Sequence, residues 1–169
     1  MFKKISLRLL LLTFLIVILQ TTFIPYYSIN GIRPDMVSAL FLAILYRYPT
    51  INAIYVAFFI GIIKSLFSNY YFGVDIIALI IPATFFPFLI RKADLSNILV
   101  KFLITVILLL IHFVVFIIIL STINNIMHTR SFLYDKLFGI TLYTSVITLI
   151  IDKMVRKFIP RKTEQYELF

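Results

Sequence analysis

The chain lacks cysteine and tryptophan, and it has little glycine or histidine. Its 169 residues include no Cys, no Trp, four Gly and two His. The absence of cysteine excludes disulfide frameworks, thiolate metal sites and cysteine nucleophiles. The four glycines are too dispersed to form a phosphate-binding loop, and neither a G-x-S-x-G nor an H-E-x-x-H motif occurs. The sequence therefore predicts no catalytic residues, no cofactor and no metal ion.

Charge is also scarce, and most of it is positive. Charged residues make up 14 % of the chain, against about 25 % in an average soluble domain. Hydrophobic residues make up 62 %, and the mean hydropathy is +1.08. A soluble monomer of 19.8 kDa cannot bury that much apolar surface, while 18 Phe and 10 Tyr exclude a disordered chain. This composition predicts an all-α integral membrane protein.

Six apolar runs are separated by clusters of charge. They span residues 9–32, 36–46, 51–67, 74–90, 102–123 and 137–151. A membrane-spanning helix needs about 20 residues, so six of them leave room for short loops only. Residues 1–169 are thus expected to form a single polytopic membrane domain with short basic tails at both ends. The loops are expected to include Lys101 and the polar residues of 124–136.

Two runs have unusual features. The second is so short that we expect Tyr46, Arg47 and Tyr48 to extend it by snorkelling at its end. The fourth contains Pro82 and Pro87, which predict a kinked or broken helix because proline removes a backbone donor.

The basic residues fall unequally on the two sides of a six-span arrangement. One side carries twelve, namely Lys3, Lys4, Arg8, Arg47, Arg91, Lys92, Lys101, Lys153, Arg156, Lys157, Arg161 and Lys162. The other side carries four, namely Arg33, Lys64, Arg130 and Lys136. The positive-inside rule then places both termini in the cytoplasm, and the net charge of +9 needs no nucleic-acid partner. A re-entrant hairpin of the second and third runs, with four spans in all, would give nearly the same count and stays open.

The third run carries a face of small residues. Ala53, Ala57, Gly61 and Ser65 follow one another at intervals of four, which places them along one side of a helix. Small residues let helices approach closely in lipid. Packing within the bundle and docking of a partner's helix are both consistent with this face.

The sixth run carries a face of hydroxyl groups. Thr141, Thr144, Ser145 and Thr148 share one side of the helix, with Asp152 a turn beyond. We expect this face to pack between helices, with its hydroxyls bonded to carbonyl groups four residues earlier. A polar conduit or a ligand-binding wall is the alternative.

Three further residues are candidates because of where they stand. His112 lies midway along the fifth run with no carboxylate at similar depth, which predicts a neutral, hydrogen-bonded histidine rather than a proton relay. Asp35 and Asp75 each stand where a helix should begin, so both are expected to cap free N–H groups. Arg33 can pair with Asp35 at the membrane surface, and recognition of a partner is the alternative.

The order of these features resembles the rod shape-determining protein MreD family. The similar motifs lie within about residues 15–80 and are Leu19-Gln20-Thr21-Thr22 before Pro25, Arg33-Pro34-Asp35, Arg47 with Pro49, residues 61–68, and Gly73-Val74-Asp75. They correspond to the family's "RPD", "R-x-P", "GLLxDLLS" and "PLGxxAL". Ser65 stands in place of the family's aspartate, and Tyr71 and Phe72 in place of its Pro-Leu.

The resemblance implies a small protein of the bacterial cytoplasmic (inner) membrane that acts in cell elongation without being an enzyme. Its partners would be membrane lipid, a bitopic MreC-like protein, a RodA-like glycosyltransferase, a penicillin-binding transpeptidase and an MreB-like filament. Its fold would be similar to the six-helix substrate-binding subunit of energy-coupling-factor transporters. The expected partner interface comprises Arg33, Asp35, Ala53, Ala57, Gly61, Ser65 and Asp75.

Two other functions compete with this scaffold role in cell shape and peptidoglycan synthesis. The first is a vitamin-binding subunit of an energy-coupling-factor transporter. Against it stand the lack of an Ala-x-x-x-Ala pair in residues 9–19 and the few polar groups near the outer loops. The second, a lipid-modifying enzyme, ranks last because acid, base and metal ligands are missing.

Overall fold

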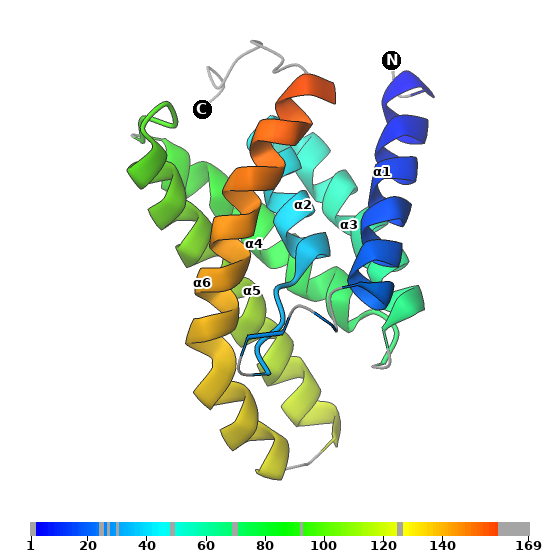
Figure 1. The fold of residues 1–169 in the computed structure, drawn as a ribbon, viewed down its shortest axis with the longest axis vertical. Coiled ribbons are helices and arrows are strands. Elements are labelled where there is room, and N and C mark those ends of the chain that lie inside the picture. The colour runs from blue at the N-terminus through cyan, green and yellow to red at the C-terminus, as the bar shows by residue number, and fades with distance from the viewer. Residues whose placement is uncertain are drawn as a thin grey trace.

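The computed structural model describes residues 3–23, 26, 28–29, 31–47, 50–68, 71–91, 93–124 and 127–158, without the side chains at 3–10, 50–52, 124, 127–135 and 157–158. This part of the chain is all-helical and contains no strand (Figure 1). Its six α-helices are α1 (Lys3–Thr22), α2 (Met36–Leu45), α3 (Thr50–Phe67), α4 (Val74–Ile90), α5 (Ile98–Asn124) and α6 (Met127–Phe158). The predicted helical fold class is thereby confirmed.

The helix boundaries match the apolar runs best in the middle of the chain. Helix α4 covers the fourth run from end to end and continues through Pro82 and Pro87 as one helix. Of the predicted kink or break, the break does not occur, and the kink stays a prediction. The predicted loop at 124–136 is wrong, because α6 already begins at Met127. Between there and Gly139 no glycine or proline interrupts helix formation, and polarity alone does not end a helix.

The helices run alternately up and down, so that α1 begins and α6 ends at the same end of the molecule (Figure 1). Helix α2 lies at the centre, where it packs against α1, α3, α4 and α6. Residues 37–45 are all buried. Because the central helix has only 10 residues, both of its ends lie inside the bundle, and the neighbouring helices extend past them.

The end of α2 shows this most clearly. Tyr46 is 4 % exposed and Arg47 is 8 % exposed, so the prediction that they snorkel to a surface is wrong. Both side chains instead find polar partners on α5 and α6. Tyr48 lies outside the described residues. The prediction that Lys101 lies in a loop is also wrong, because Lys101 is a buried residue of α5.

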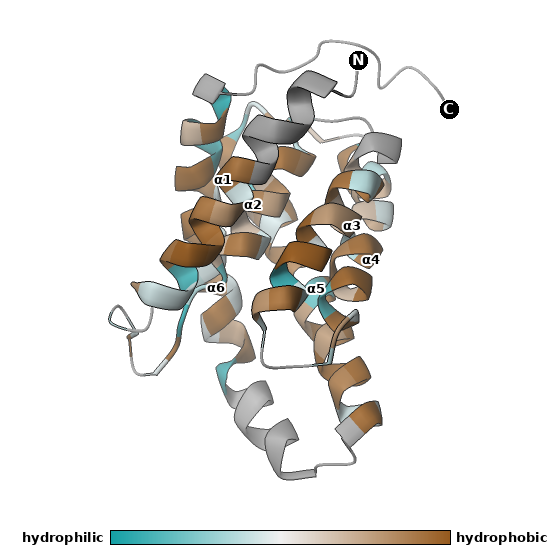
Figure 2. Ribbon diagram, turned by 90° about the vertical axis from the view of Figure 1, so that its right-hand side faces the viewer, coloured by the Kyte–Doolittle hydropathy of each residue, from teal (hydrophilic) through white to brown (hydrophobic). Residues whose placement is uncertain are grey.

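The outer surface of the bundle is apolar. Figure 2 shows that hydrophobic residues predominate along the helices. Many large apolar side chains are exposed there, among them Leu15, Phe59, Phe88, Leu103 and Ile150. Among the described residues two helical segments, Ile98–Ile123 and Lys136–Arg156, are long and apolar enough to cross a membrane, and four others are apolar but shorter.

A turn between α4 and α5 carries one exposed carboxylate, Asp94. The hydroxyl and the backbone N–H of Ser96 hydrogen-bond this carboxylate and hold the pKa of Asp94 below its usual value. Asp94 contacts none of the charged residues discussed below, which makes it a suitable control position.

Candidate functional site

The site is built around the start of α2. Asp35 is the N-cap residue: its Oδ1 accepts a hydrogen bond from the backbone N–H of Ser38 at 3.0 Å, and its Oδ2 accepts one from the Ser38 hydroxyl at 2.6 Å. The backbone N–H of Asp35 donates to Thr144 Oγ1 of α6 at 3.1 Å. The N–H of Val37 donates to Gln20 Oε1 of α1 at 2.9 Å. The predicted cap at Asp35 is confirmed, and it also ties α2 to two neighbours.

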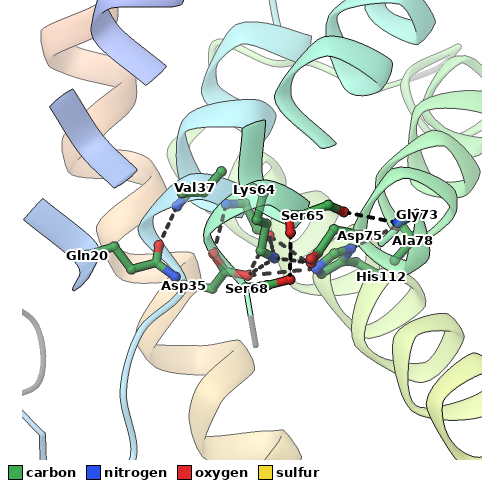
Figure 3. A network of polar contacts seen from close by, with 11 residues as sticks. Gln20, Asp35, Val37, Lys64, Ser65, Ser68, Gly73, Asp75, Ala78 and His112 are labelled. Atoms are coloured by element: carbon green, nitrogen blue, oxygen red, sulfur yellow. Dashed lines mark hydrogen bonds and ion pairs between the residues drawn. The ribbon is translucent and has the colours of Figure 1, made fainter. Parts of the chain in front are cut away.

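Lys64 of α3 joins two carboxylates across this cap (Figure 3). Its Nζ lies 2.6 Å from Asp35 Oδ2, 3.1 Å from Asp75 Oδ1 and 3.2 Å from the Ser38 hydroxyl oxygen. Three acceptors thus match the three N–H donors of the ammonium group. Asp75 is 1 % exposed, and its other oxygen, Oδ2, has no hydrogen-bond partner among the described residues.

The prediction that Asp75 caps its helix is wrong. The N-cap of α4 is Gly73, whose φ of +98° lies in the left-handed region that glycine tolerates. The carboxylate of Asp75 lies in the first helical turn and reaches Lys64 instead. A buried ammonium group without a counter-charge costs more free energy than a helix N-terminus without a side-chain cap. This difference explains why Asp75 pairs with Lys64 instead of capping α4.

His112 of α5 completes the site. Its Nδ1 donates to the carbonyl oxygen of Ala78 at 2.8 Å, because a carbonyl can only accept. Its Nε2 lies 3.1 Å from the Ser38 hydroxyl oxygen and 3.8 Å from Asp35 Oδ2. The predicted hydrogen bonding of His112 is confirmed, and its predicted isolation from carboxylates is wrong. Its predicted neutral state stays a prediction. Helix α5 extends beyond α2, α3 and α4, so its middle lies level with their ends (Figure 1).

A cavity of about 630 Å³ adjoins these side chains. All six helices or their connections contribute to its wall. The lining residues are Val17, Gln20, Thr21, Arg33, Pro34, Asp35, Val37, Lys64, Phe67, Ser68, Asp75, His112, Phe113, Phe116, Ile117, Leu137 and Ile140. The carboxylates of Asp35 and Asp75 and the ammonium of Lys64 therefore share one space with the imidazole of His112 and with apolar and aromatic side chains of the surrounding helices.

Arg33 and Ser65 have different positions from those considered in the sequence. Arg33 is exposed and lines the cavity. In the described part of the chain no ion pair joins it to Asp35, whose ammonium partner is Lys64. Ser65 is 4 % exposed, and its hydroxyl oxygen accepts a hydrogen bond from the backbone N–H of Gly73 at 3.4 Å. It thus holds the connection between α3 and α4.

The small-residue face of α3 is occupied within the chain. Ala53 is 1 % exposed and Ala57 is 0 % exposed. A Cβ atom added at Gly61 would lie 2.7 Å from the Cα atom of Ile76, so α3 and α4 touch backbone to backbone there. These residues serve internal packing, and a partner's helix would have to displace α4 to reach them. Their role in partner binding stays a prediction.

The hydroxyl face of α6 is also internal. Thr141, Ser145 and Thr148 donate to the carbonyl groups of residues four positions earlier, at 2.7–2.8 Å. All three are 0 % exposed, as is Thr144. The face lies in the helix that packs against α2, so the predicted packing role with back-bonded hydroxyls is confirmed.

A second charged cluster lies at the other end of α2, about 18 Å away along the helix. The carboxylate of Asp152 on α6 is 2.9 Å from Arg47 and 3.0 Å from Arg156, and it also pairs with Lys101 of α5. The Lys101 ammonium lies 4.6 Å from the centroid of the Tyr46 ring. In the described part of the chain, one buried carboxylate thus holds three cations.

The sequence did not single out Lys64, Ser38 or Lys101. A signal existed for Lys64, because it is the one charge inside the apolar run 51–67. An ionisable residue in such a run is a candidate functional residue whose partner should be sought on other helices. The spacing of the runs gives no comparable signal for Ser38 or Lys101, whose roles depend on the relative depth of α2 and α5.

The interpretation of this site rests on its geometry, because comparison with known proteins adds nothing to it. No family model, no curated protein and no solved structure matches the chain. Among the described residues no group of three or more histidine or acidic side chains is arranged to hold a metal ion. The arrangement offers carboxylates, an ammonium and an imidazole beside an apolar cavity, which suits binding of a small polar group.

Proposed function

We propose that the chain is a non-enzymatic membrane scaffold of the bacterial cell-elongation (rod) complex. The observation that carries this proposal is the convergence of residues from the MreD-like motifs. Asp35 and Asp75 come from two separate motifs, yet both pair with Lys64 (Figure 3). Ser65, from a third motif, follows Lys64 on α3 and accepts a hydrogen bond from Gly73, close to Asp75 in the chain. Short apolar motifs can match by chance, but chance does not favour their polar members meeting at one place.

The proposed setting is the cytoplasmic (inner) membrane, with a chain that passes from side to side six times and both termini in the cytoplasm. The 10-residue α2 makes its passage inside the protein, enclosed by longer helices. The alternating helix directions and the exposed apolar side chains support six crossings. The excess of basic residues at the end that holds both termini supports the orientation. In this orientation the Asp35 cluster lies toward the outside, and the Asp152 cluster lies toward the cytoplasm.

As a scaffold the protein would act through its outer faces. The two buried charged clusters hold α2 rigidly between its neighbours, while side chains such as Phe58, Phe85 and Ile107 face outward. Lipid-facing surfaces of this kind associate with other helices by close packing. A bitopic MreC-like protein fits such a surface, and RodA-like, transpeptidase and MreB-like partners would follow from the same complex.

A second candidate is favoured by the cavity. The sequence argues against a vitamin-binding transporter subunit because polar groups near the outer loops are few. The structure supplies them from the ends of α2, α3 and α4 and from the middle of α5, since Asp35, Lys64, Asp75 and His112 all line the cavity. A ligand-binding subunit of an energy-coupling-factor transporter therefore stays as the alternative.

The test is a census of partners in the organism that encodes the protein. The chain is tagged at its C-terminus, cross-linked in living cells, solubilised gently and purified with its partners. Recovery of MreC-like, RodA-like or transpeptidase proteins is the expected result. An Asp94→Asn chain is the matched control, because an exposed carboxylate in a turn should not affect assembly.

Two outcomes would overturn the scaffold proposal. Recovery of a membrane coupling protein with paired ATPases would establish the transporter alternative. Recovery of neither set, with the tagged chain still restoring normal growth to cells that lack the native copy, would show that the function needs no rod-complex partner.

A further inference from the structure

We propose that the cytoplasmic end of α6 binds the phosphate of an anionic phospholipid, such as phosphatidylglycerol. The contact groups are Lys153 and Arg156, beside the buried carboxylate of Asp152. The inference rests on the proposed membrane setting, but it does not depend on whether the chain is a scaffold or a transporter subunit. Three observations carry it: an excess of positive charge in the Asp152 cluster, N–H donors of Arg156 that this carboxylate does not use, and an apolar stripe on α6 that leads to both cations.

Positive charge exceeds negative charge in the Asp152 cluster. In the part of the chain that the structure describes, the carboxylate of Asp152 is shared by three cations, Arg47, Lys101 and Arg156. Arg47 and Lys101 are 8 % and 6 % exposed, so water offsets their charge only in part. An anion at the edge of the cluster would add negative charge where it is in deficit, whereas a cation would be repelled.

Arg156 is the member of the cluster that a lipid headgroup can reach. Its side chain is 60 % exposed, whereas the side chains of Arg47 and Lys101 are each 7 % exposed. Its Nε and Nη2 atoms hydrogen-bond Asp152 Oδ2 at 3.1 and 3.0 Å, which uses two of the five N–H donors of a guanidinium group. The other donors suit phosphate oxygens, and the two buried cations strengthen such a contact through their field.

Lys153 provides a second exposed cation beside Arg156. Residues three positions apart are neighbours on the surface of a helix, so the two side chains project from the same part of α6. Lys153 forms no ion pair with a carboxylate of the described residues. Two exposed cations next to a cluster with excess positive charge make this place more positive than the basic end of the molecule in general.

An apolar stripe of α6 leads to these cations. Leu142, Val146 and Leu149 precede Lys153 at intervals of four, three and four residues, which places them along one side of the helix. Val146 is 50 % exposed, and the two leucines are partly exposed. A phospholipid has the same order of groups, with acyl chains followed by a phosphate, whereas an acidic peptide would use the charge alone. In the proposed orientation this end faces the cytoplasmic leaflet, whose surface is negative.

The experiment titrates the full chain, purified in an uncharged detergent, with four probes. Dioctanoyl phosphatidylglycerol carries a net negative charge, dioctanoyl phosphatidylcholine adds a cation to the same phosphate, dioctanoylglycerol lacks the phosphate, and inorganic phosphate lacks the acyl chains. Binding is measured by isothermal calorimetry. We expect phosphatidylglycerol to bind about fivefold more tightly than phosphatidylcholine or dioctanoylglycerol, and to bind more weakly as salt is added. Inorganic phosphate should bind far more weakly than phosphatidylglycerol.

Two variants locate the site. Arg156→Gln and Lys153→Gln each remove one positive charge from it, and each should weaken phosphatidylglycerol binding about fivefold. Lys153→Gln leaves the contacts of Asp152 intact, so it keeps the test decisive even if Arg156→Gln disturbs the fold. Arg91→Gln is the matched control, because it removes an exposed positive charge from the C-cap of α4, at the same end of the molecule. This control should bind phosphatidylglycerol as the unaltered chain does.

Three results would overturn the proposal. Phosphatidylglycerol that binds no more tightly than phosphatidylcholine would show that negative charge is not recognised. Equal loss of binding in Arg91→Gln and in the two α6 variants would show general attraction to a basic end instead of a site. Inorganic phosphate that binds as tightly as phosphatidylglycerol would show an anion site that does not use a lipid. The partner census measures a different interaction, so failure of this inference and failure of the scaffold proposal are distinguishable.

Discussion

Buried charge is the feature that matters most at the scale of single residues. Asp152 is 2 % exposed, while Arg47 and Lys101 beside it are 8 % and 6 % exposed. Removing ions from water carries a large penalty, which attraction between them offsets only if each charge keeps its partner. Each charged side chain in such a cluster therefore stabilises the fold only while its partners are present. Loss of one leaves the others buried without a counter-charge.

Replacement of Asp152 should destabilise the protein strongly. In Asp152→Asn the buried cations Arg47 and Lys101 lose their counter-charge, which should lower the free energy of unfolding by about 3–5 kcal/mol. Thermal unfolding in detergent, followed by circular dichroism, measures the change. Asp94→Asn is the control and should stay within about 0.5 kcal/mol of the unaltered chain. Equal effects of the two changes would contradict a structural role for the Asp152 cluster.

The Lys64 cluster allows a sharper test, because a second change should repair the first. Lys64→Met leaves the carboxylates of Asp35 and Asp75 close together without a cation, so it should destabilise the chain. Asp75→Asn in the same chain removes one of the two carboxylates and should recover about 1–3 kcal/mol of the loss. A double-mutant cycle of unfolding free energies measures this coupling. Purely additive effects would show that Lys64 does not link the two carboxylates.

At the scale of elements, helix length decides which residues meet. Helix α2 has 10 residues, while α5 has 27 and α6 has 32. The short helix ends inside the bundle at both sides, and its two ends coincide with the two charged clusters. The buried charges thus lie at the two ends of α2, where a helix leaves backbone N–H and C=O groups without intrahelical partners. Their side chains also occupy the space beyond each end of this short helix.

The contact between α3 and α4 should tolerate even one added methyl group poorly. In Gly61→Ala the new Cβ would lie 2.7 Å from the Cα atom of Ile76, a backbone atom that cannot rotate away. We expect a loss of about 1–3 kcal/mol in unfolding free energy.

A matched change on α6 provides the comparison. In Gly139→Ala the new Cβ would meet the Cδ1 atom of Ile32 at 2.5 Å, which is the tip of a flexible side chain. Alanine also favours a helix over glycine by about 1 kcal/mol, so this variant should be nearly neutral. Unfolding curves of the two variants decide the matter, and a Gly139→Ala variant that is the less stable of the two would refute the packing argument.

At the scale of the whole molecule, the exterior is apolar, and the mainly apolar interior also holds buried charged and polar side chains. Phe59 and Phe88 are 60 % and 79 % exposed, whereas His112 and Asp75 are buried among the helices. Such an apolar exterior differs from the surface of a water-soluble bundle and suits a lipid environment. In the proposed membrane setting, opposite ends of the molecule would face different aqueous compartments.

The proposed orientation predicts which turns are reached from outside the cell. The chain contains no cysteine, so single cysteines can be introduced without background labelling. In intact cells a membrane-impermeant maleimide should label Tyr71→Cys, in the connection between α3 and α4. Ser96→Cys, between α4 and α5, should be labelled only after the membrane is opened. The opposite pattern would mean that the termini lie outside, and labelling of both in intact cells would exclude an α4 that crosses the membrane.

Several features could be predicted from the sequence because they depend on neighbours along the chain. The apolar run at 74–90, whose one charge is Asp75, set the ends of α4, and a carboxylate three residues before Ser38 set the cap of α2. The regular spacing of hydroxyls on α6 likewise predicted their back-bonding and burial. Such features need only local geometry, and the packed structure did not alter them.

The pairing of charges could not be predicted in the same way. In the sequence only run length indicates helix depth, and it predicts Asp35 and Asp75 at the rims of the bundle and His112 apart from any carboxylate. In the folded chain the long α5 and α6 extend past the short α2, which shifts the middle of α5 to the level of the Asp35 cap (Figure 1).

The sequence by itself determined the helical composition, most helix positions, the apolar exterior and the excess of positive charge. Only the tertiary structure decided that Lys64 lies between Asp35 and Asp75, that Asp152 lies among Arg47, Lys101 and Arg156, and that a cavity adjoins the first cluster. The reason is physical. A charge in an apolar interior is stabilised by whichever opposite charge lies within a few ångströms, and the relative depth of the helices determines which one that is.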